Sequence, residues 1–131
     1  MRNVIALFLA LFAVACGPVS DVEYEGDPQE NAVHAFTQTY GAPSETCERR
    51  ALDAEVTTLS LGDTRLACND HVVGCVTWPG DSRSDARIVI AEEQDPGVLA
   101  HETLHILLIC SGKLDDNNGH RGSVWHLKGI H

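Results

Sequence analysis

The first regular pattern of apolar residues in this chain lies between Gln29 and Tyr40. Ala32, Val33 and Phe36 are spaced there so that they fall on one face of a helix. Gly41-Ala42-Pro43 follows directly, and this combination of glycine and proline ends a helix. The pattern therefore predicts an N-terminal helix with one buried face.

Three short segments further along have the composition of β-strands. Glu55 to Leu61 alternates apolar residues with threonines, and both Val72 to Trp78 and Arg87 to Ala91 are rich in β-branched residues. Gly62-Asp63 after the first segment and Pro79-Gly80-Asp81 after the second have the composition of turns. These segments predict a small three-stranded sheet.

A second helical segment is bounded on both sides by residues typical of helix ends. Asp95 suits the N-cap and Pro96 the first helical position, while Ser111-Gly112-Lys113 suits the C-terminal end. From Val98 to Ile109 the segment is apolar almost all round, which indicates a buried helix. The exceptions are four polar residues: His101, Glu102, Thr103 and His105. Together these elements predict an α+β fold.

The polar residues of this helix have the spacing of a metal site. His101 and His105 are four positions apart and share one helix face, so both imidazoles can bind one ion. Zinc prefers such nitrogen ligands in a tetrahedral shell and keeps one place open for water when the site is catalytic. Zinc would acidify that water and Glu102 would accept its proton, which yields a nucleophile. The alternative is a buried helix whose histidines only form hydrogen bonds. Burial of these groups without a partner is costly, so we favour about one zinc per chain.

The run His101-Glu102-Thr103-Leu104-His105 resembles the HExxH motif of the zincin metallopeptidases. With a coarse order of elements, the resemblance covers the last two thirds of the chain. Metzincins place Gly and a third His where this chain has Leu108 and Ser111, and gluzincins need a later Glu, which is absent after Glu102. The resemblance implies a minimal zincin-like fold with an edge strand along the cleft. It also implies a peptide or protein substrate, whose carbonyl is attacked by a zinc-bound water that Glu102 activates.

A third metal ligand must come from the C-terminal segment. We favour His120, because the turn-rich residues 112–119 can reverse the chain and bring it back over the helix. His126 is the alternative third ligand, or a donor that stabilises charge on a substrate oxygen. The remaining candidates are less favoured by position or type: His131, Asp115 and Asp116.

The N-terminus has the pattern of an export signal. Arg2 precedes an apolar run from Val4 to Val14, which is too short to span a bilayer. The run ends at Ala15-Cys16-Gly17, which resembles the lipobox of bacterial lipoproteins and implies lipidation of Cys16. In enterobacterial lipoproteins, Gly after that cysteine points to the outer membrane. The alternative is a secretory peptide cut at Ala15, with Cys16 in a disulfide.

These features divide the chain into three parts. Residues 1–15 are the expected lipoprotein signal peptide, residues 16–30 an acidic tether, and residues 31–131 the metal-binding domain. Four cysteines remain in the domain, and an even number in an exported protein suggests two disulfides. We expect Cys68 to pair with Cys75 across a short turn, which leaves Cys47 for Cys110. A cysteine zinc site is disfavoured, since the sequence contains no CxxC pair.

The formal net charge is −10. Such an acidic chain is not expected to bind nucleic acid or anionic lipid. The sequence thus predicts a zinc-dependent hydrolase anchored to the bacterial envelope, with a metallopeptidase as the leading possibility. The alternatives are a zinc-binding lipoprotein without catalysis and a degenerate zincin-like binding module. Nothing in the sequence indicates the oligomeric state.

Overall fold

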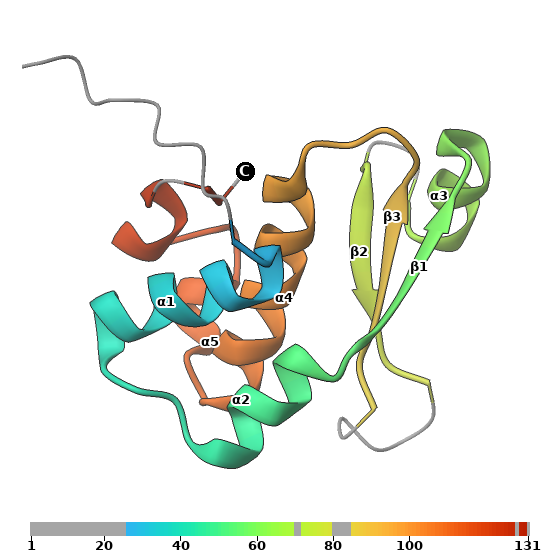
Figure 1. Cartoon of the computed structure of the whole chain (residues 1–131). Helices are drawn as coiled ribbons and strands as arrows, with labels where there is room; N and C mark the ends of the chain where they lie inside the picture. The colour runs from blue at the N-terminus through green and yellow to red at the C-terminus, as the bar shows by residue number, and fades with distance from the viewer. Residues whose placement is uncertain (1–25, 70–71, 80–84, 128, 131) are drawn as a thin grey trace, which may run out of the picture.

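The computed structural model describes residues 26–69, 72–79, 85–127 and 129–130, and this part of the chain has the predicted α+β architecture. Its elements in chain order are α1 (Pro28–Tyr40), α2 (Glu45–Leu52), β1 (Glu55–Leu59), α3 (Leu61–Ala67), β2 (Gly74–Thr77), β3 (Arg87–Ala91), α4 (Pro96–Cys110), α5 (Leu114–Asn117) and the 3₁₀ helix η1 (Ser123–His126). Helices α1, α2 and α4 lie on one side of the sheet and α3 on the other (Figure 1). None of the described helices combines the length and apolar character needed to cross a membrane. The predicted signal peptide and Cys16 lie outside the described residues.

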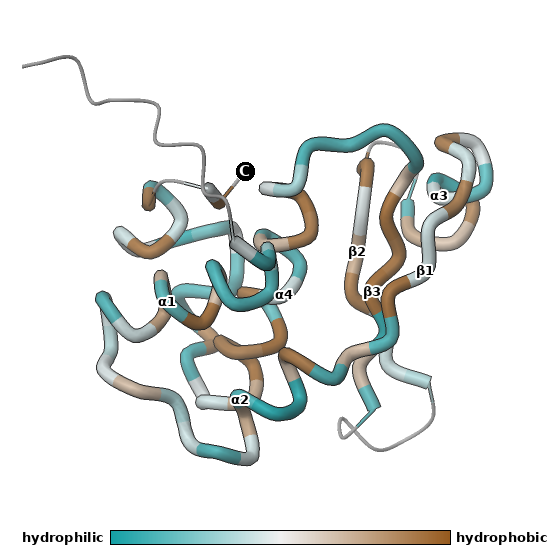
Figure 2. Tube along the Cα trace, in the orientation of Figure 1, coloured by the Kyte–Doolittle hydropathy of each residue, from teal (hydrophilic) through white to brown (hydrophobic). Residues whose placement is uncertain are grey.

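The sheet has the order β1-β3-β2, so β3 is central and β2 is an edge strand. β3 runs parallel to β1 and antiparallel to β2, and Ile88 faces Val56 on one side and Val76 on the other. A central strand is covered on both faces, which explains its continuous apolar sequence (Figure 2). Ile88 is fully buried and joins the core formed with α4.

Helix α4 forms the centre of the core. Leu104, Ile106, Leu107 and Leu108 are all 0% exposed, because α1, α2, β2 and β3 pack around the helix. The predicted ends are confirmed: the Asp95 carboxylate accepts a hydrogen bond from Gly97 N at 2.7 Å, and Ser111 is the C-cap. The buried helix therefore fixes the positions of its four polar residues.

Helix α1 begins slightly earlier than predicted. Asp27 is the N-cap and accepts a hydrogen bond from Gln29 N at 2.8 Å, so the helix starts at Pro28. The last three residues of the predicted tether, 28–30, thus belong to the folded domain. Ala32 and Phe36 are buried in the core, as the pattern predicts.

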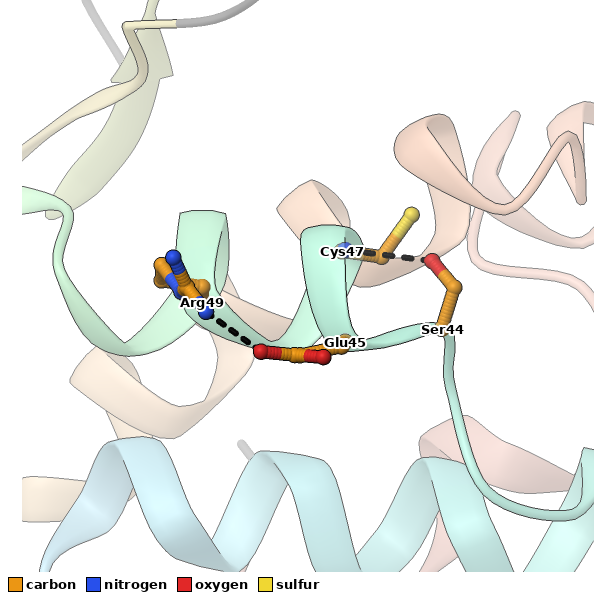
Figure 3. Close-up of polar contacts among 4 residues, drawn as sticks. All are labelled: Ser44, Glu45, Cys47 and Arg49. Carbon is orange, nitrogen blue, oxygen red and sulfur yellow. Dashed lines mark hydrogen bonds and ion pairs between the residues drawn. The ribbon is translucent and has the colours of Figure 1, made fainter.

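Helix α2 was not predicted from the sequence, and its ends are stabilised by polar residues. The Ser44 hydroxyl accepts a hydrogen bond from Cys47 N at 3.2 Å, and Arg49 pairs with Glu45 one turn away (Figure 3). Cys47 forms a disulfide with Cys110 at the end of α4, with a Cα–Cα distance of 5.6 Å. This confirms the expected pairing and fixes α2 to the central helix.

The second disulfide holds α3 against the far face of the sheet. Cys68, the C-cap of α3, is bonded to Cys75 of β2, which confirms the other expected pair. The predicted turn at Gly62-Asp63 is wrong, because these residues lie in the first turn of α3. Ser60 caps that helix by accepting a hydrogen bond from Asp63 N at 3.1 Å. As a result the preceding strand ends at Leu59 and not at Leu61.

Two further boundaries differ from the sequence prediction. The second strand covers Gly74–Thr77 only, which is shorter than the predicted 72–78. Residues 112–119 are not all turn, since Leu114–Asn117 form the short helix α5. Both differences lie near the candidate metal residues, where α5 and β2 flank α4.

Candidate metal centre

Three histidines form a cluster on the exposed side of α4. His101 and His105 are one turn apart on that helix, and His120 approaches them from the segment after α5. His120 Nε2 lies 3.0 Å from His101 Nε2 and 3.2 Å from His105 Nε2. The nitrogens of the three residues lie within 4.8 Å of one another. The cluster could therefore hold a metal ion.

His120 reaches this position through a tight reversal of the chain. Its φ angle is 54°, and the preceding Gly119 has a φ of 69°, so two consecutive residues are left-handed. Histidine is among the few non-glycine residues that adopt this conformation with some frequency. The reversal turns the chain back from α5 toward α4. The chain therefore turns back to α4 within the turn-rich segment, as the sequence predicts.

The arrangement fits zinc. Two nitrogens bound tetrahedrally at about 2.0–2.1 Å from zinc lie about 3.3 Å apart, close to the observed Nε2–Nε2 distances. Three histidines also leave one of four coordination places open. Ligand number, ligand type and these two distances are compatible with a tetrahedral metal site.

A hydrogen bond from outside the cluster orients His105. Its Nδ1 lies 2.7 Å from Asn117 Oδ1, and since that oxygen only accepts, the ring proton is on Nδ1 and Nε2 is free to bind metal. Burial lowers the pKa of His105, and the charge of His120 lowers it further, although the Asn117 hydrogen bond opposes both. His105 is therefore favoured in its neutral, metal-binding form.

Trp125 forms a buried wall behind the three imidazoles. Its ring centroid lies 4.8 Å from those of His101 and His105 and 4.6 Å from that of His120. The indole Nε1 donates a hydrogen bond of 2.7 Å to the carbonyl oxygen of Asp116. The cluster is thus supported from behind by a buried residue of η1.

Asp116 has a structural role and is not part of the histidine cluster. Its carboxylate accepts a hydrogen bond from the Tyr40 hydroxyl of α1. Burial, together with this hydrogen bond and the Asp116 charge, raises the pKa of Tyr40 to about 12. The bond ties α5 to α1 and so holds both Asn117 and Trp125 in place.

The other candidate ligands also lie apart from the cluster. His126 is exposed on η1, Asp115 is exposed on α5, and the metal-compatible group found among the described residues contains neither. His131 lies outside the described residues. Of the possible third ligands, the structure therefore brings His120 to the two helical histidines.

Glu102 lies on the same helix and is buried, with 7% of its surface exposed. Within the described residues no hydrogen bond or ion pair reaches its carboxylate, and burial raises the pKa of Glu102 to about 7. Its carboxylate oxygens keep access to solvent at the cleft, and carboxyl groups that are desolvated in this way concentrate at functional sites. Glu102 is thus suited to accept a proton near neutral pH.

A cleft of about 330 Å³ opens in front of Glu102 and the three histidines. Its other side is formed by the edge strand and its flanks, with Val72, Gly74, Cys75, Val76 and Trp78. A larger groove of about 800 Å³ lies near Arg49, Arg50 and Arg87 and contains no residue of the cluster. We place the site in the smaller cleft, because that cleft contains the chemically suited residues.

Comparisons with known proteins add no relative. The chain matches no protein-family model, and neither the search of curated proteins nor that of solved structures gives a significant match. Functional conclusions therefore rest on the geometry of the site.

Sequence reasoning missed three residues that shape this site: Asn117, Trp125 and Gly74. Asn117 is followed by Asn118, and no sequence signal distinguishes the residue that reaches His105 from its neighbour. Gly74 lies inside the predicted apolar strand 72–78, where a glycine is unfavourable, and this is the one signal in the sequence that points to it.

Proposed function

We propose that this protein is a zinc-dependent hydrolase, and more specifically a small metallopeptidase with a minimal zincin-like domain. The observation that carries the proposal is the position of Glu102. This buried and unpaired carboxyl group lies beside three histidines that are spaced for zinc, at a cleft bounded by an edge strand. Such a combination of ligands, base and cleft supports hydrolysis.

Each residue has a defined role in the proposal. His101, His105 and His120 hold the ion, and Asn117 keeps His105 in the tautomer that presents Nε2. Zinc, when bound, supplies a Lewis acid that acidifies water. Glu102 takes the proton from the attacking water and passes it to the leaving amine, and its position on the cleft beside the three histidines suits both steps.

The edge strand supports a peptide as the substrate. β2 borders the cleft and pairs with β3 on one side only, so its other edge can add an extended peptide as a further strand. The nature of the substrate also rests on the resemblance to zincins, which cleave peptides, and is therefore an argument by analogy.

Metal analysis tests the first step of the proposal. We expect about one zinc per chain in protein purified without chelator, because three histidine ligands define a single site. His105→Ala should lose most of this zinc, since it removes one of the three ligands, whereas His126→Ala should retain it, since that side chain is exposed and outside the cluster. Zinc far below stoichiometry after reconstitution, or equal loss in both variants, would refute the site.

We further propose that the protein is a lipoprotein of the bacterial envelope, on the basis of the apolar leader and Cys16. The full-length protein should then fractionate with membranes and carry a lipid mass on its N-terminal peptide. Cys16→Ser should prevent processing or release soluble material. A serine substitution elsewhere in the predicted leader, Asn3→Ser, should behave as wild type. Fractionation unchanged in Cys16→Ser, with no lipid on the peptide, would contradict the anchor.

A further inference from the structure

Gly74 lies directly opposite the Glu102 carboxylate. It is the first residue of β2, is buried, and belongs to the strand face that turns toward α4. A Cβ atom at this position would lie 3.2 Å from Glu102 Oε1 and 3.3 Å from Glu102 Cγ. Both distances are shorter than ordinary van der Waals contacts, so an added methyl group would require Glu102 to move by a few tenths of an ångström.

The backbone does not require glycine here. Gly74 is not among the glycines with positive φ, so its conformation is open to any residue. Glycine also loses more conformational freedom on folding than any other residue, so alanine would be the more stable choice where space allows. A glycine that the backbone does not need therefore points to a requirement for space, and the atoms that use this space belong mainly to Glu102.

We propose that Gly74 is a positioning residue of the site, which sets the place of the Glu102 carboxylate by leaving room for it against the edge strand. The role of that carboxylate as a base rests on the proposed function. A side chain at position 74 would displace the carboxylate away from β2 and out of line with the water that it must deprotonate. Gly74 does not contact the ion in this scheme, and its effect on the position of the base is exerted through Glu102.

One competing explanation must be separated from this proposal. The same Cβ would also lie 3.2 Å from the carbonyl oxygen of Val89 on the neighbouring strand. Glycine could then serve only the packing of the two strands. The two explanations differ in one respect: only the first makes the effect of a methyl group depend on Glu102.

A double-mutant cycle measures this dependence without any substrate. The unfolding midpoint in denaturant is compared for wild type, Gly74→Ala, Glu102→Ala and the double variant, each metal-free and zinc-loaded. Gly74→Ala should lower the midpoint, and the lowering should shrink by more than half when Glu102→Ala has removed Cγ and the carboxylate. If Gly74→Ala alone does not fold, recovery of folding in the double variant gives the same result.

Gly62→Ala is the matched control, because a Cβ there meets no atom within 4 Å and the residue lies in α3. This change should be insensitive to Glu102→Ala. Equal lowering by Gly74→Ala in both backgrounds would overturn the inference and leave Val89 as the cause.

Kinetics on a substrate of the wild type tests the positioning role itself. Gly74→Ala should reduce kcat by about tenfold or more with KM and zinc content unchanged, since small displacements of catalytic groups have large effects. If the double-mutant cycle shows coupling but the protein binds no zinc, the contact between Gly74 and Glu102 is upheld and the proposed function is refuted. If the protein binds zinc and its cleavage depends on Glu102, but the cycle shows no coupling, only the proposed role of Gly74 is refuted.

Discussion

Glu102→Gln should abolish nearly all turnover while leaving the zinc content unchanged. A positioned general base typically contributes ~10²–10⁴-fold to the rate, and the amide cannot accept a proton from water. The amide has the same shape as the carboxyl group, and Glu102 is not one of the three clustered histidines, so metal binding should persist. A broad peptide library screened with the wild type gives the substrate, and kcat and bound zinc are then measured for both proteins.

Glu92→Gln provides the matched control, because it makes the same chemical change at an exposed position just after β3. It should retain wild-type turnover. If wild type and Glu102→Gln both bind zinc firmly and neither cleaves any peptide, the binding alternative replaces the enzyme, and only the metal site remains. Equal turnover of wild type and Glu102→Gln would instead exclude Glu102 as the base.

The elements that sequence predicted well are those whose apolar residues decide their structure. α4 is apolar almost all round and is capped at Asp95, and β3 is a continuous apolar run at the centre of the sheet. Helices α2 and α3 were missed because they bury few apolar side chains. α2 buries only Cys47 and Ala51 and depends on the cap at Ser44, which a local pattern of hydrophobicity does not reveal.

The residues of the site also fall into those that the sequence predicts and those that it does not. His101 and His105 are one turn apart on a helix, so sequence alone places both on one face and Glu102 beside them. The third histidine depends on how residues 112–119 fold, and the left-handed backbone at Gly119 and His120 decides it. Contacts between distant segments, such as Gly74 with Glu102, require the register of the sheet against α4 and could not be predicted.

Glu102→Gln should also change how the stability of the metal-free protein depends on pH. Burial raises the pKa of Glu102 from its ordinary value of 4.5 to about 7, so folding favours the protonated carboxyl. The resulting stability is fully present below about pH 4.5 and is lost as the pH rises through about 7. The loss is on the order of 3 kcal/mol. Glutamine mimics the protonated form at every pH, so the variant should be the more stable protein at pH 8, by up to that amount.

The difference between the two proteins isolates Glu102 from other titrating groups. His105, whose pKa is lowered by burial, acts in the opposite sense, because its contribution is present at higher pH and is lost as the pH falls below its ordinary value of 6.5. This contribution is common to both proteins and cancels when their unfolding free energies are subtracted, provided that both are measured in chelator from pH 4 to 8. With zinc bound, the nearby positive charge favours the ionised carboxylate, so the difference at pH 8 should shrink. A difference that stays constant over this pH range in the metal-free proteins would show that the carboxyl group is solvated or paired. The proposed mechanism, which depends on a buried base, would then be refuted.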